Sequence, residues 1–366
     1  MNYPFRNLVF EGGGVKGIAY IGAMQVLEKK RILDNIVRVG GASAGAINAL
    51  LFGLGYTTEE TYNILWRLDF RHFKDASWWP LNVLRMFNRY GWYKGEFFKK
   101  WIESLIRQKT GSPHTTFAEL SQKKGTQGFR DISMIGTNLS TRFSEIYSSE
   151  LTPDMQLADA VRISMSIPLF FKAVRDARHD VLVDGGVLDN YPVKLFDREK
   201  FIVPEERKAN STVPDYYRER NKLLEDASSP YVYNKQTLGF RLDTKEEIQV
   251  FRDHKPPPSY SIHSFVSYAT GLIGTLLEAQ ESQHLHSDDW HRTVYIDTLG
   301  IKTTDFDLSE EKKKELLKSG ESNTEMYFRW YENPGSVVIN RVRDSSSEDL
   351  MMLRKLRRKA SGKKRR

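Results

Sequence analysis

A serine between glycines joins a strand signal to a helix signal, and this junction constrains the fold more than any other stretch of the chain. The apolar run 36–39 precedes it and the helix-like run 46–51 follows it. The junction itself consists of Gly41, Ala42, Ser43, Ala44 and Gly45. A strand, a sharp turn and a helix that meet at a serine form a nucleophile elbow, in which larger side chains two positions from the serine would collide. The pattern predicts an α/β fold that presents a reactive hydroxyl.

A glycine-rich loop lies upstream of this junction. It follows the apolar run 7–11, opens the helix-like run 18–28 and consists of Gly12, Gly13, Gly14, Val15, Lys16 and Gly17. Backbone N–H groups in such a loop approach a negative atom closely, and the helix N-terminus adds its positive dipole end. A dinucleotide site would need an acidic residue at the end of the second strand, where this chain has Ser43. The loop is therefore interpreted as an oxyanion hole, with the N–H groups of Gly13–Val15 as donors and Lys16 as either an added positive charge or a solvated side chain.

A candidate base follows a third apolar run at residues 180–183. Asp184 ends this run and is followed by Gly185 and Gly186. Alone, an Asp-Gly pair after a strand is an ordinary turn. Together with the serine junction and the glycine-rich loop, it predicts that Asp184 accepts the proton of Ser43.

These three motifs, in this order, make the chain resemble the patatin-like phospholipases and lipid acyl hydrolases. The run 161–171, with an arginine, two serines, a proline and two phenylalanines, is similar to a further stretch of that family, and the resemblance covers roughly residues 7–195. It implies a three-layer α/β/α fold with a central, mostly parallel sheet. It also implies a Ser43–Asp184 dyad that works without a histidine.

The activity that the resemblance implies is hydrolysis of fatty-acyl ester bonds in phospholipids or other acyl lipids, without a metal or an organic cofactor. The alternatives are an acyltransferase, a broad carboxylesterase, or a catalytically idle scaffold that binds a membrane or a partner. An activating ligand or protein is compatible with any of them. If Asp184 is not the base, His263 and His284 are the next candidates.

The sequence predicts one catalytic domain over residues 1–345. Within it we expect the core motifs at 7–195, an aromatic helical segment at about 57–110 and a polar insertion at about 197–235. Later expected elements are a strand at 236–243, a helix at 265–281, a strand at 293–297 and a charged helix from Ser309 to about Trp330, with a break at Ser319-Gly320. We expect residues 346–366 to form a basic, disordered tail.

Positive charge is concentrated at the end of the chain. The net charge is +8, and residues 354–366 hold nine Lys or Arg and no acid, so the remainder of the chain, at +8 minus 9, is near neutral at −1. The tail is a candidate contact for anionic lipid and equally a solvated chain end. Five tryptophans at 66–101, interleaved with basic residues, suit a membrane interface or a packed core. We expect a cytoplasmic or peripheral membrane protein with no signal peptide, no transmembrane segment and no specific nucleic-acid ligand.

Metal-binding residue types gather at positions 284–291. The stretch contains His284, His286 and His291 with two aspartates, but its spacing departs from a zinc-ligand pattern. A loop between two elements explains it more simply, so no metal site is expected. The chain contains no cysteine, which excludes disulfide and thiol chemistry.

Overall fold

The computed structural model describes residues 3–75, 78–225, 228–245, 287–303, 305 and 307–341, with a few isolated positions between 262 and 275. Its centre is an eight-stranded sheet in the order β12-β11-β1-β2-β4-β8-β7, with β5 paired to β4. The strands are β1 (Asn7–Phe10), β2 (Arg38–Ala42), β4 (Asp131–Asn138), β5 (Phe143–Ser148), β7 (Val174–Arg175), β8 (Val181–Asp184), β11 (Thr237–Asp243) and β12 (Thr293–Asp297). The expected strands at 236–243 and 293–297 are therefore present.

The half of the sheet that carries the glycine-rich loop and the serine junction is parallel. β12, β11, β1, β2 and β4 pair in parallel, whereas β5, β8 and β7 run antiparallel to their neighbours. All four residues of β1 are buried, as expected for a strand covered on both faces. The expected mixed α/β fold with a mostly parallel central sheet is confirmed.

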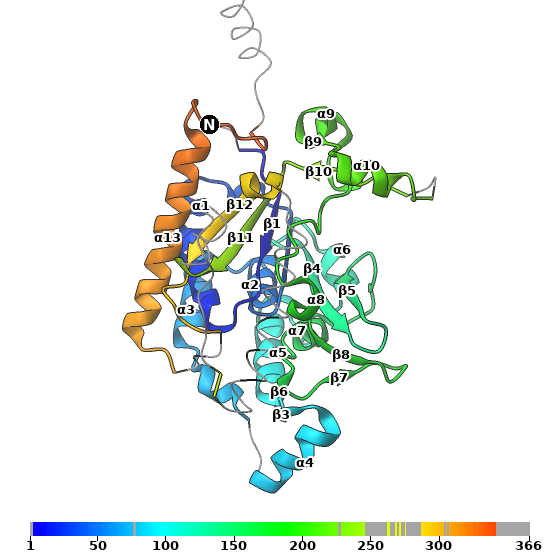
Figure 1. Cartoon of the computed structure of the whole chain (residues 1–366), viewed down its shortest axis with the longest axis vertical. Helices are drawn as coiled ribbons and strands as arrows, with labels where there is room; N and C mark the ends of the chain where they lie inside the picture. The colour runs from blue at the N-terminus through cyan, green and yellow to red at the C-terminus, as the bar shows by residue number, and fades with distance from the viewer. Residues whose placement is uncertain are drawn as a thin grey trace, which may run out of the picture.

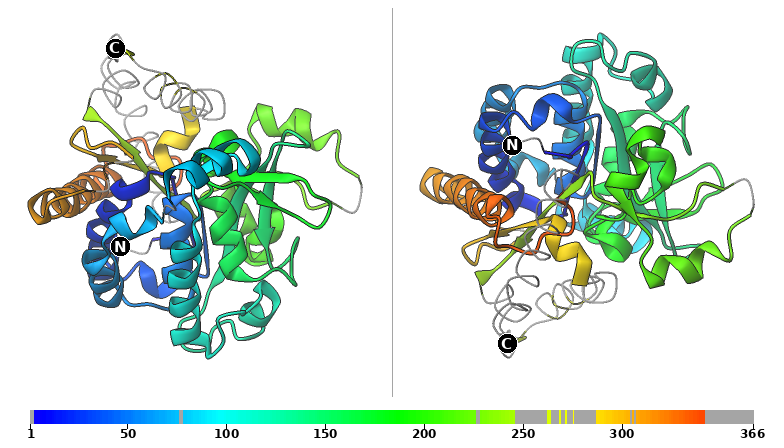
Figure 2. Two further views of the ribbon diagram at one scale, coloured as in Figure 1. Left: turned by 90° about the horizontal axis from the view of Figure 1, so that it is seen from below. Right: turned by 90° about the horizontal axis from the view of Figure 1, so that it is seen from above.

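Helices cover the sheet on both sides, with the blue and orange helices on one side and the green segment on the other (Figures 1 and 2). The α-helices are α1 (Ala19–Lys29), α2 (Ala44–Gly53), α3 (Thr58–Arg67), α4 (Trp79–Arg89), α5 (Glu96–Thr110), α6 (Phe117–Gln122), α7 (Leu157–Ser164), α8 (Gly186–Asp189), α9 (Arg207–Asn210), α10 (Asp215–Asn221) and α13 (Glu310–Glu332). Short 3-10 turns include η1 (Gly14–Ile18), η3 (Phe70–Phe73) and η6 (Ser287–Arg292). Two small sheets pair β3 (Gly91–Tyr93) with β6 (Leu169–Phe171), and β9 (Ser211–Thr212) with β10 (Tyr233–Asn234).

Helix α13 corrects one sequence expectation, because it runs without a break through Ser319-Gly320. A Cβ on Gly320 would lie 1.9 Å from the carbonyl oxygen of Ala19, and one on Gly22 would lie 1.9 Å from that of Leu317. These glycines allow the backbones of α1 and α13 to approach closely, so Gly320 serves helix packing instead of ending the helix. The expected helix at 265–281 and the tail at 346–366 fall outside the described residues.

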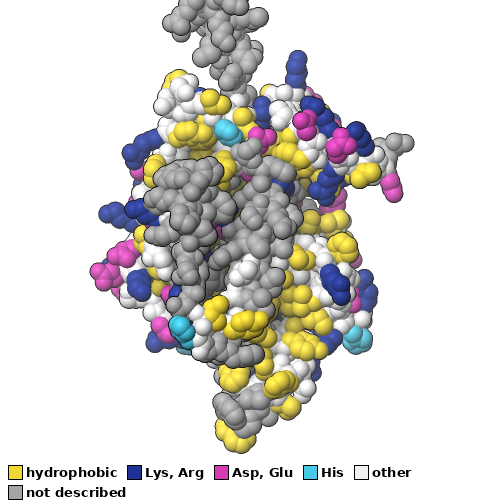
Figure 3. Space-filling view, in the orientation of Figure 1, with side chains coloured by type: hydrophobic (Ala, Val, Ile, Leu, Met, Phe, Trp, Pro, Cys, Tyr) yellow, Lys and Arg dark blue, Asp and Glu magenta, His cyan; other side chains and the backbone are white. Residues whose placement is uncertain are grey.

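Hydrophobic side chains are exposed at the lower end of the molecule in Figure 3, where α4 projects in Figure 1. Trp78 and Phe87 are each 76% exposed, and Leu84 is 57% exposed. Most of the large apolar side chains of the sheet and of α1 and α2 are buried. The projecting helix therefore differs from the rest of the fold in the side chains it shows to solvent.

Candidate active site

Ser43 occupies a sharp turn between β2 and α2. Its backbone angles are φ 52° and ψ −127°, a conformation that residues other than glycine rarely adopt. A Cβ on Gly45 would lie 2.2 Å from the carbonyl oxygen of Phe10, and one on Gly41 would lie 2.6 Å from the backbone of Gly45. The flanking glycines therefore allow the turn to sit tightly against β1. The elbow that the sequence predicts is present.

Asp184 reaches the same place from the other side of β4. Ala42, the last residue of β2, is paired with Ile135, and Asp184 is paired with the next residue along β4, Gly136. β2 is parallel to β4 and β8 is antiparallel to it. Ser43, directly after β2, and Asp184, at the end of β8, nevertheless lie at the same level of the sheet. The structure thus brings Ser43 and Asp184 together although 141 positions of sequence separate them.

The carboxylate of Asp184 is buried and only partly hydrogen-bonded. Its Oδ1 accepts a hydrogen bond of 2.8 Å from the Gly186 N–H, while Oδ2 has no partner of normal geometry among the described residues. Burial raises the pKa of Asp184 to about 7, and hydrogen bonding by the Gly186 N–H and the Ser43 side chain opposes this rise. In the conformation described, Ser43 Oγ also lies 3.6 Å from the sulfur of Met165.

The glycine-rich loop lies directly against Ser43. A Cβ on Gly12 would lie 2.9 Å from that of Ser43, and the Gly12 N–H donates to the Asn190 carbonyl at 3.0 Å. Asn190 Nδ2 in turn donates to the Gly12 carbonyl at 3.3 Å. Asn190 follows Asp184, Gly185 and Gly186 by a few residues, so the chain after the base motif holds the loop in place.

The N–H groups of this loop are not equivalent. The Val15 N–H donates to the carbonyl of Thr303 at 3.3 Å. Those of Gly13 and Gly14 have no acceptor in the described part of the chain. Gly14 has a φ of +55°, and a Cβ there would lie 2.1 Å from the Thr303 oxygen. Among the described residues, the N–H groups of the two glycines are thus unpaired, whereas that of Val15 is engaged.

Lys16 and Gly17 have packing contacts in the structure. Lys16 Nζ donates to the carbonyl of Leu242 on β11 at 3.4 Å. A Cβ on Gly17 would lie 3.3 Å from Asn48 and 3.5 Å from Ala44, both on α2. Lys16 therefore bridges to the neighbouring strand, and Gly17 lets the loop approach the helix that follows Ser43.

A hydrogen-bond network beneath the two motifs was not among the predicted site residues. The Ser43 N–H donates to Ser164 Oγ at 3.0 Å, and the Asp184 N–H donates to the Ser166 carbonyl at 3.0 Å. Arg162 donates to Ser166 Oγ at 2.6 Å and to the carbonyls of Lys94 and Lys172, each at 3.0 Å. Burial lowers the pKa of Arg162 to about 10. This value is still well above neutral pH, so the side chain stays charged.

The sequence signal for this network was the arginine and serines of the run 161–171. The run contributed to the family resemblance, but nothing in it assigned those side chains to Ser43 or Asp184. The end of α7 now connects the two directly, since Ser164 contacts one and Ser166 the other.

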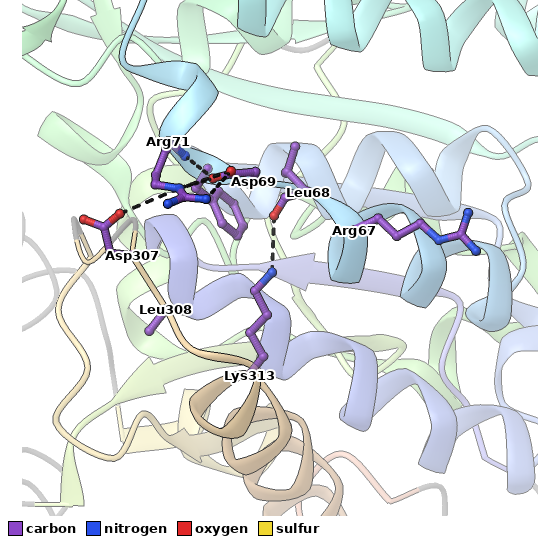
Figure 4. A pocket seen from close by; sticks show the side chains of 8 residues that line it. Arg67, Leu68, Asp69, Arg71, Asp307, Leu308 and Lys313 are labelled. Atoms are coloured by element: carbon purple, nitrogen blue, oxygen red, sulfur yellow. Dashed lines mark hydrogen bonds and ion pairs between the residues drawn. The ribbon is translucent and has the colours of Figure 1, made fainter.

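A surface pocket lies elsewhere, between the end of α3, η3 and the start of α13 (Figure 4). Arg71 forms an ion pair with Asp69 at 2.8 Å, and Lys313 Nζ donates to the carbonyls of Trp66 and Leu68 at 2.9 and 3.2 Å. These charged groups are satisfied by nearby protein atoms. None of the predicted site residues lines the pocket, so it is treated as a packing junction.

The described residues hold no group of three side chains arranged to bind a metal. His291 is described, and burial lowers its pKa; His284 and His286 lie outside the described residues. No helix in the part of the chain that the structure describes has the length and apolar character needed to span a bilayer.

A serine in a sharp turn, a buried aspartate and a glycine-rich loop lie together at the carboxyl end of the parallel strands of this α/β fold. The family model for patatin-like phospholipase matches residues 8–197. The chain belongs to this family, and membership supports a lipid hydrolase.

Two curated proteins show how this chain is similar to known sequences. The chain is 29% identical over 330 residues to the uncharacterized protein YqhO of Bacillus subtilis, covering 88% of this chain and 97% of the relative. It is 26% identical over 196 residues to the probable lipid hydrolase 463L of Invertebrate iridescent virus 6, covering 52% of this chain and 63% of the viral protein.

Among solved structures, VipD from Legionella pneumophila has a similar fold. The TM-score is 0.52 at 17% identity, and the match covers 89% of this chain and 67% of VipD. At this identity the likeness concerns the fold alone.

Proposed function

We propose that the protein is a serine lipid acyl hydrolase of phospholipase A type. The observation that carries the proposal is the pairing of Ala42 and Asp184 with successive residues of β4, which brings a strained serine and a buried carboxylate together beside the glycine-rich loop. Family membership and the name of the viral relative support a lipid substrate.

In the proposed reaction, Ser43 Oγ attacks the carbonyl carbon of an acyl ester while its proton passes to Asp184. The tetrahedral intermediate collapses, the ester C–O bond breaks, and the leaving alcohol takes the proton from Asp184. Water then attacks the acyl-enzyme, again giving a proton to Asp184, and Ser43 recovers that proton as the fatty acid departs. The dyad ends the cycle in the state in which it began.

The environment of Asp184 suits this role. An aspartate with the usual pKa of about 3.9 is a weak base for a serine hydroxyl. Burial raises the pKa of Asp184 to about 7, which matches the base to neutral pH. Oδ2, which has no well-formed bond among the described residues, is the oxygen available to take the proton.

The negative charge that develops on the substrate oxygen requires N–H donors. We assign this role to Gly13 and Gly14, since the Val15 N–H already donates to Thr303. One such donor typically contributes about 10²–10³ in kcat in acyl-transfer enzymes. The sequence expectation of Gly13–Val15 as donors is thereby narrowed to two residues.

The test is an assay of the purified full chain on phosphatidylcholine and phosphatidylglycerol vesicles and on a short-chain nitrophenyl ester, with Ser43→Ala as the matched control. We expect release of free fatty acid and lysophospholipid by the wild type alone, at the same rate with and without a chelator. Hydrolysis of the nitrophenyl ester without action on phospholipid would favour a broad carboxylesterase. Transfer of the acyl group to an added alcohol in preference to water would favour an acyltransferase, and equal rates for wild type and Ser43→Ala would refute the proposal.

A further inference from the structure

Helix α4 buries a polar side chain and exposes large apolar ones. Asn82 is only 4% exposed, and its Oδ1 accepts a hydrogen bond of 3.1 Å from Arg85. Arg85 also donates to the carbonyl of Trp92 on β3 at 2.6 Å. Asn82 and Arg85 thus face the protein, where they connect the helix to the strand that follows it.

Two large apolar side chains of α4 face solvent. Leu84 and Phe87, one helical turn apart, are 57% and 76% exposed, and Trp78 before the helix is 76% exposed. Tyr90 at its end and Leu169 on β6 extend the surface, at 46% and 40% exposed. We call these five residues the α4 surface; Figure 3 shows hydrophobic side chains at this end of the molecule. Contiguous exposed apolar side chains generally mark a site that another surface covers.

The α4 surface lies at the end of the molecule where the candidate active site lies. In Figure 1, α4 projects beyond the end of the sheet toward which β1 runs, and Ser43 follows the parallel strand β2. β3, which follows α4, is paired with β6, and Arg162 donates to the carbonyls of Lys94 and Lys172 just after these two strands. The helix is therefore attached to the same α7 network that supports Ser43 and Asp184.

Charge and residue type identify the occupant. Residues 78–94 contain Arg85, Arg89 and Lys94 and no acidic residue. Arg85 is turned to Asn82 and Trp92, whereas Arg89 is exposed and Lys94 is partly exposed. The stretch is also rich in tryptophan and tyrosine, whose amphipathic rings are stable at the level of lipid headgroups. Exposed apolar side chains flanked by cations fit an anionic bilayer surface, where the apolar groups enter the acyl region and the cations meet phosphates.

We propose that the α4 surface docks the protein on anionic phospholipid membranes, with Leu84 and Phe87 inserted below the headgroups. The choice of a lipid partner rests on the proposed function; the docking itself needs no catalysis. Docked in this way, the enzyme has the substrate-bearing surface at the end of the sheet that carries Ser43.

A single fluorescent label tests the insertion directly. Because the chain has no cysteine, Phe87→Cys creates a unique site for an environment-sensitive fluorophore. The matched control is Phe143→Cys on β5, a position that is 72% exposed. Both are made with Ser43→Ala, so that the lipid stays intact. With vesicles of equimolar phosphatidylcholine and phosphatidylglycerol, the label at 87 should show a several-fold rise in intensity and a shift to shorter wavelength, and the label at 143 should not.

Two serine pairs test the contribution to binding. Leu84→Ser/Phe87→Ser should weaken vesicle binding at least tenfold, whereas Phe143→Ser/Leu151→Ser removes the same residue types from another surface and should leave it unchanged. The difference should persist at high salt, which screens the basic tail but not apolar insertion. When Ser43 is kept, both double variants should hydrolyse a soluble ester at the wild-type rate.

Three results would overturn the docking proposal. The first is vesicle binding while the emission of the label at 87 still reports water, and the second is equal vesicle affinity for the two serine double variants. The third is a change in the emission of the label at 87 that appears without vesicles as the protein concentration rises. The last would make a second copy of the chain the occupant. Failure of the proposed function is separate, since it would appear as absent ester hydrolysis by wild type while the label still enters the bilayer.

Discussion

Around Ser43 and Asp184 polar side chains are buried, whereas on α4 apolar side chains are exposed. Asp184 and Arg162 are 3% and 5% exposed, while Phe87 is 76% exposed. Each arrangement opposes the usual distribution of residues and lowers stability or solubility by itself. In the proposed function the two regions serve different steps: the buried polar groups prepare a proton transfer, and the exposed apolar surface prepares an encounter with lipid.

The largest effect should come from the buried region. Asp184→Asn keeps the shape of the side chain but removes the base, so we expect kcat for ester hydrolysis to fall by about 10³-fold or more. The matched control is Asp189→Asn five residues later, where burial also raises the pKa to about 7 but the side chain is not in the proposed dyad. Equal losses of kcat in the two variants would mean that activity depends on any buried carboxylate in this segment, and not on Asp184 as the base.

Substitution of the buried Arg162 should destabilise the fold far more than the same substitution of an exposed arginine. Arg162→Lys keeps the charge but cannot hold Ser166 and two carbonyls at once, so we expect a loss of roughly 2–4 kcal/mol in the free energy of unfolding. Arg175→Lys, on the exposed end of β7, should change it by less than about 0.5 kcal/mol. Urea unfolding of both variants measures this difference, and a wild-type midpoint for Arg162→Lys would contradict the role given to the network.

The raised pKa of Asp184 also predicts a pH-dependent stability. The folded state retains the proton up to about pH 7, whereas the unfolded chain releases it near pH 3.9, so the free energy of unfolding falls as pH rises between these values. Asp184→Asn removes this loss, and the variant should be more stable than wild type by roughly 2–4 kcal/mol at about pH 8. The gain should vanish toward about pH 4. Thermal unfolding at both pH values tests this, and a variant less stable than wild type at the higher pH would refute it.

The smallest stability effect should come from the exposed region. Leu84→Ser/Phe87→Ser alters side chains that are already largely exposed in the folded state. Its free energy of unfolding should therefore stay within about 0.5 kcal/mol of wild type. Urea unfolding checks this. A loss of several kcal/mol would show that these side chains pack in the folded protein, which would remove the contrast between the two regions.

The basic tail offers a way to sharpen the comparison. Its residues lie outside the described part of the chain, but nine cations near an anionic surface are expected to add about 1 kcal/mol each at low salt. Deletion of 354–366 should therefore weaken vesicle binding at low salt and flatten its salt dependence, without changing soluble-ester hydrolysis. Unchanged binding at low salt would leave α4 as the main contact.

The local motifs could be predicted from sequence because each one is a short strand followed by small residues. The strand before Gly12, the elbow at Ser43 and the strand that ends at Asp184 all lie where the pattern placed them. The catalytic roles of these residues remain predictions.

Contacts between distant segments could not be read in the same way. Thr303 accepts a hydrogen bond from Val15, and Lys94 accepts one from Arg162, through backbone carbonyls that carry no sequence signal. The expected break at Ser319-Gly320 was wrong because helix packing, and not local propensity, explains that glycine. The aromatic and basic character of 66–101 was visible, but which side of α4 faces solvent depends on its contact with Trp92.

The central claim is that Ser43 is a nucleophile activated by Asp184, and covalent labelling tests it most directly. The purified chain is treated at neutral pH with an alkyl fluorophosphonate, which phosphonylates activated serines, and the modified peptide is identified by mass spectrometry. The account predicts a single adduct on Ser43 that is lost in Ser43→Ala, strongly slowed in Asp184→Asn and retained in Asp189→Asn. Labelling of another serine, or labelling of Ser43 at the wild-type rate in Asp184→Asn, would contradict it.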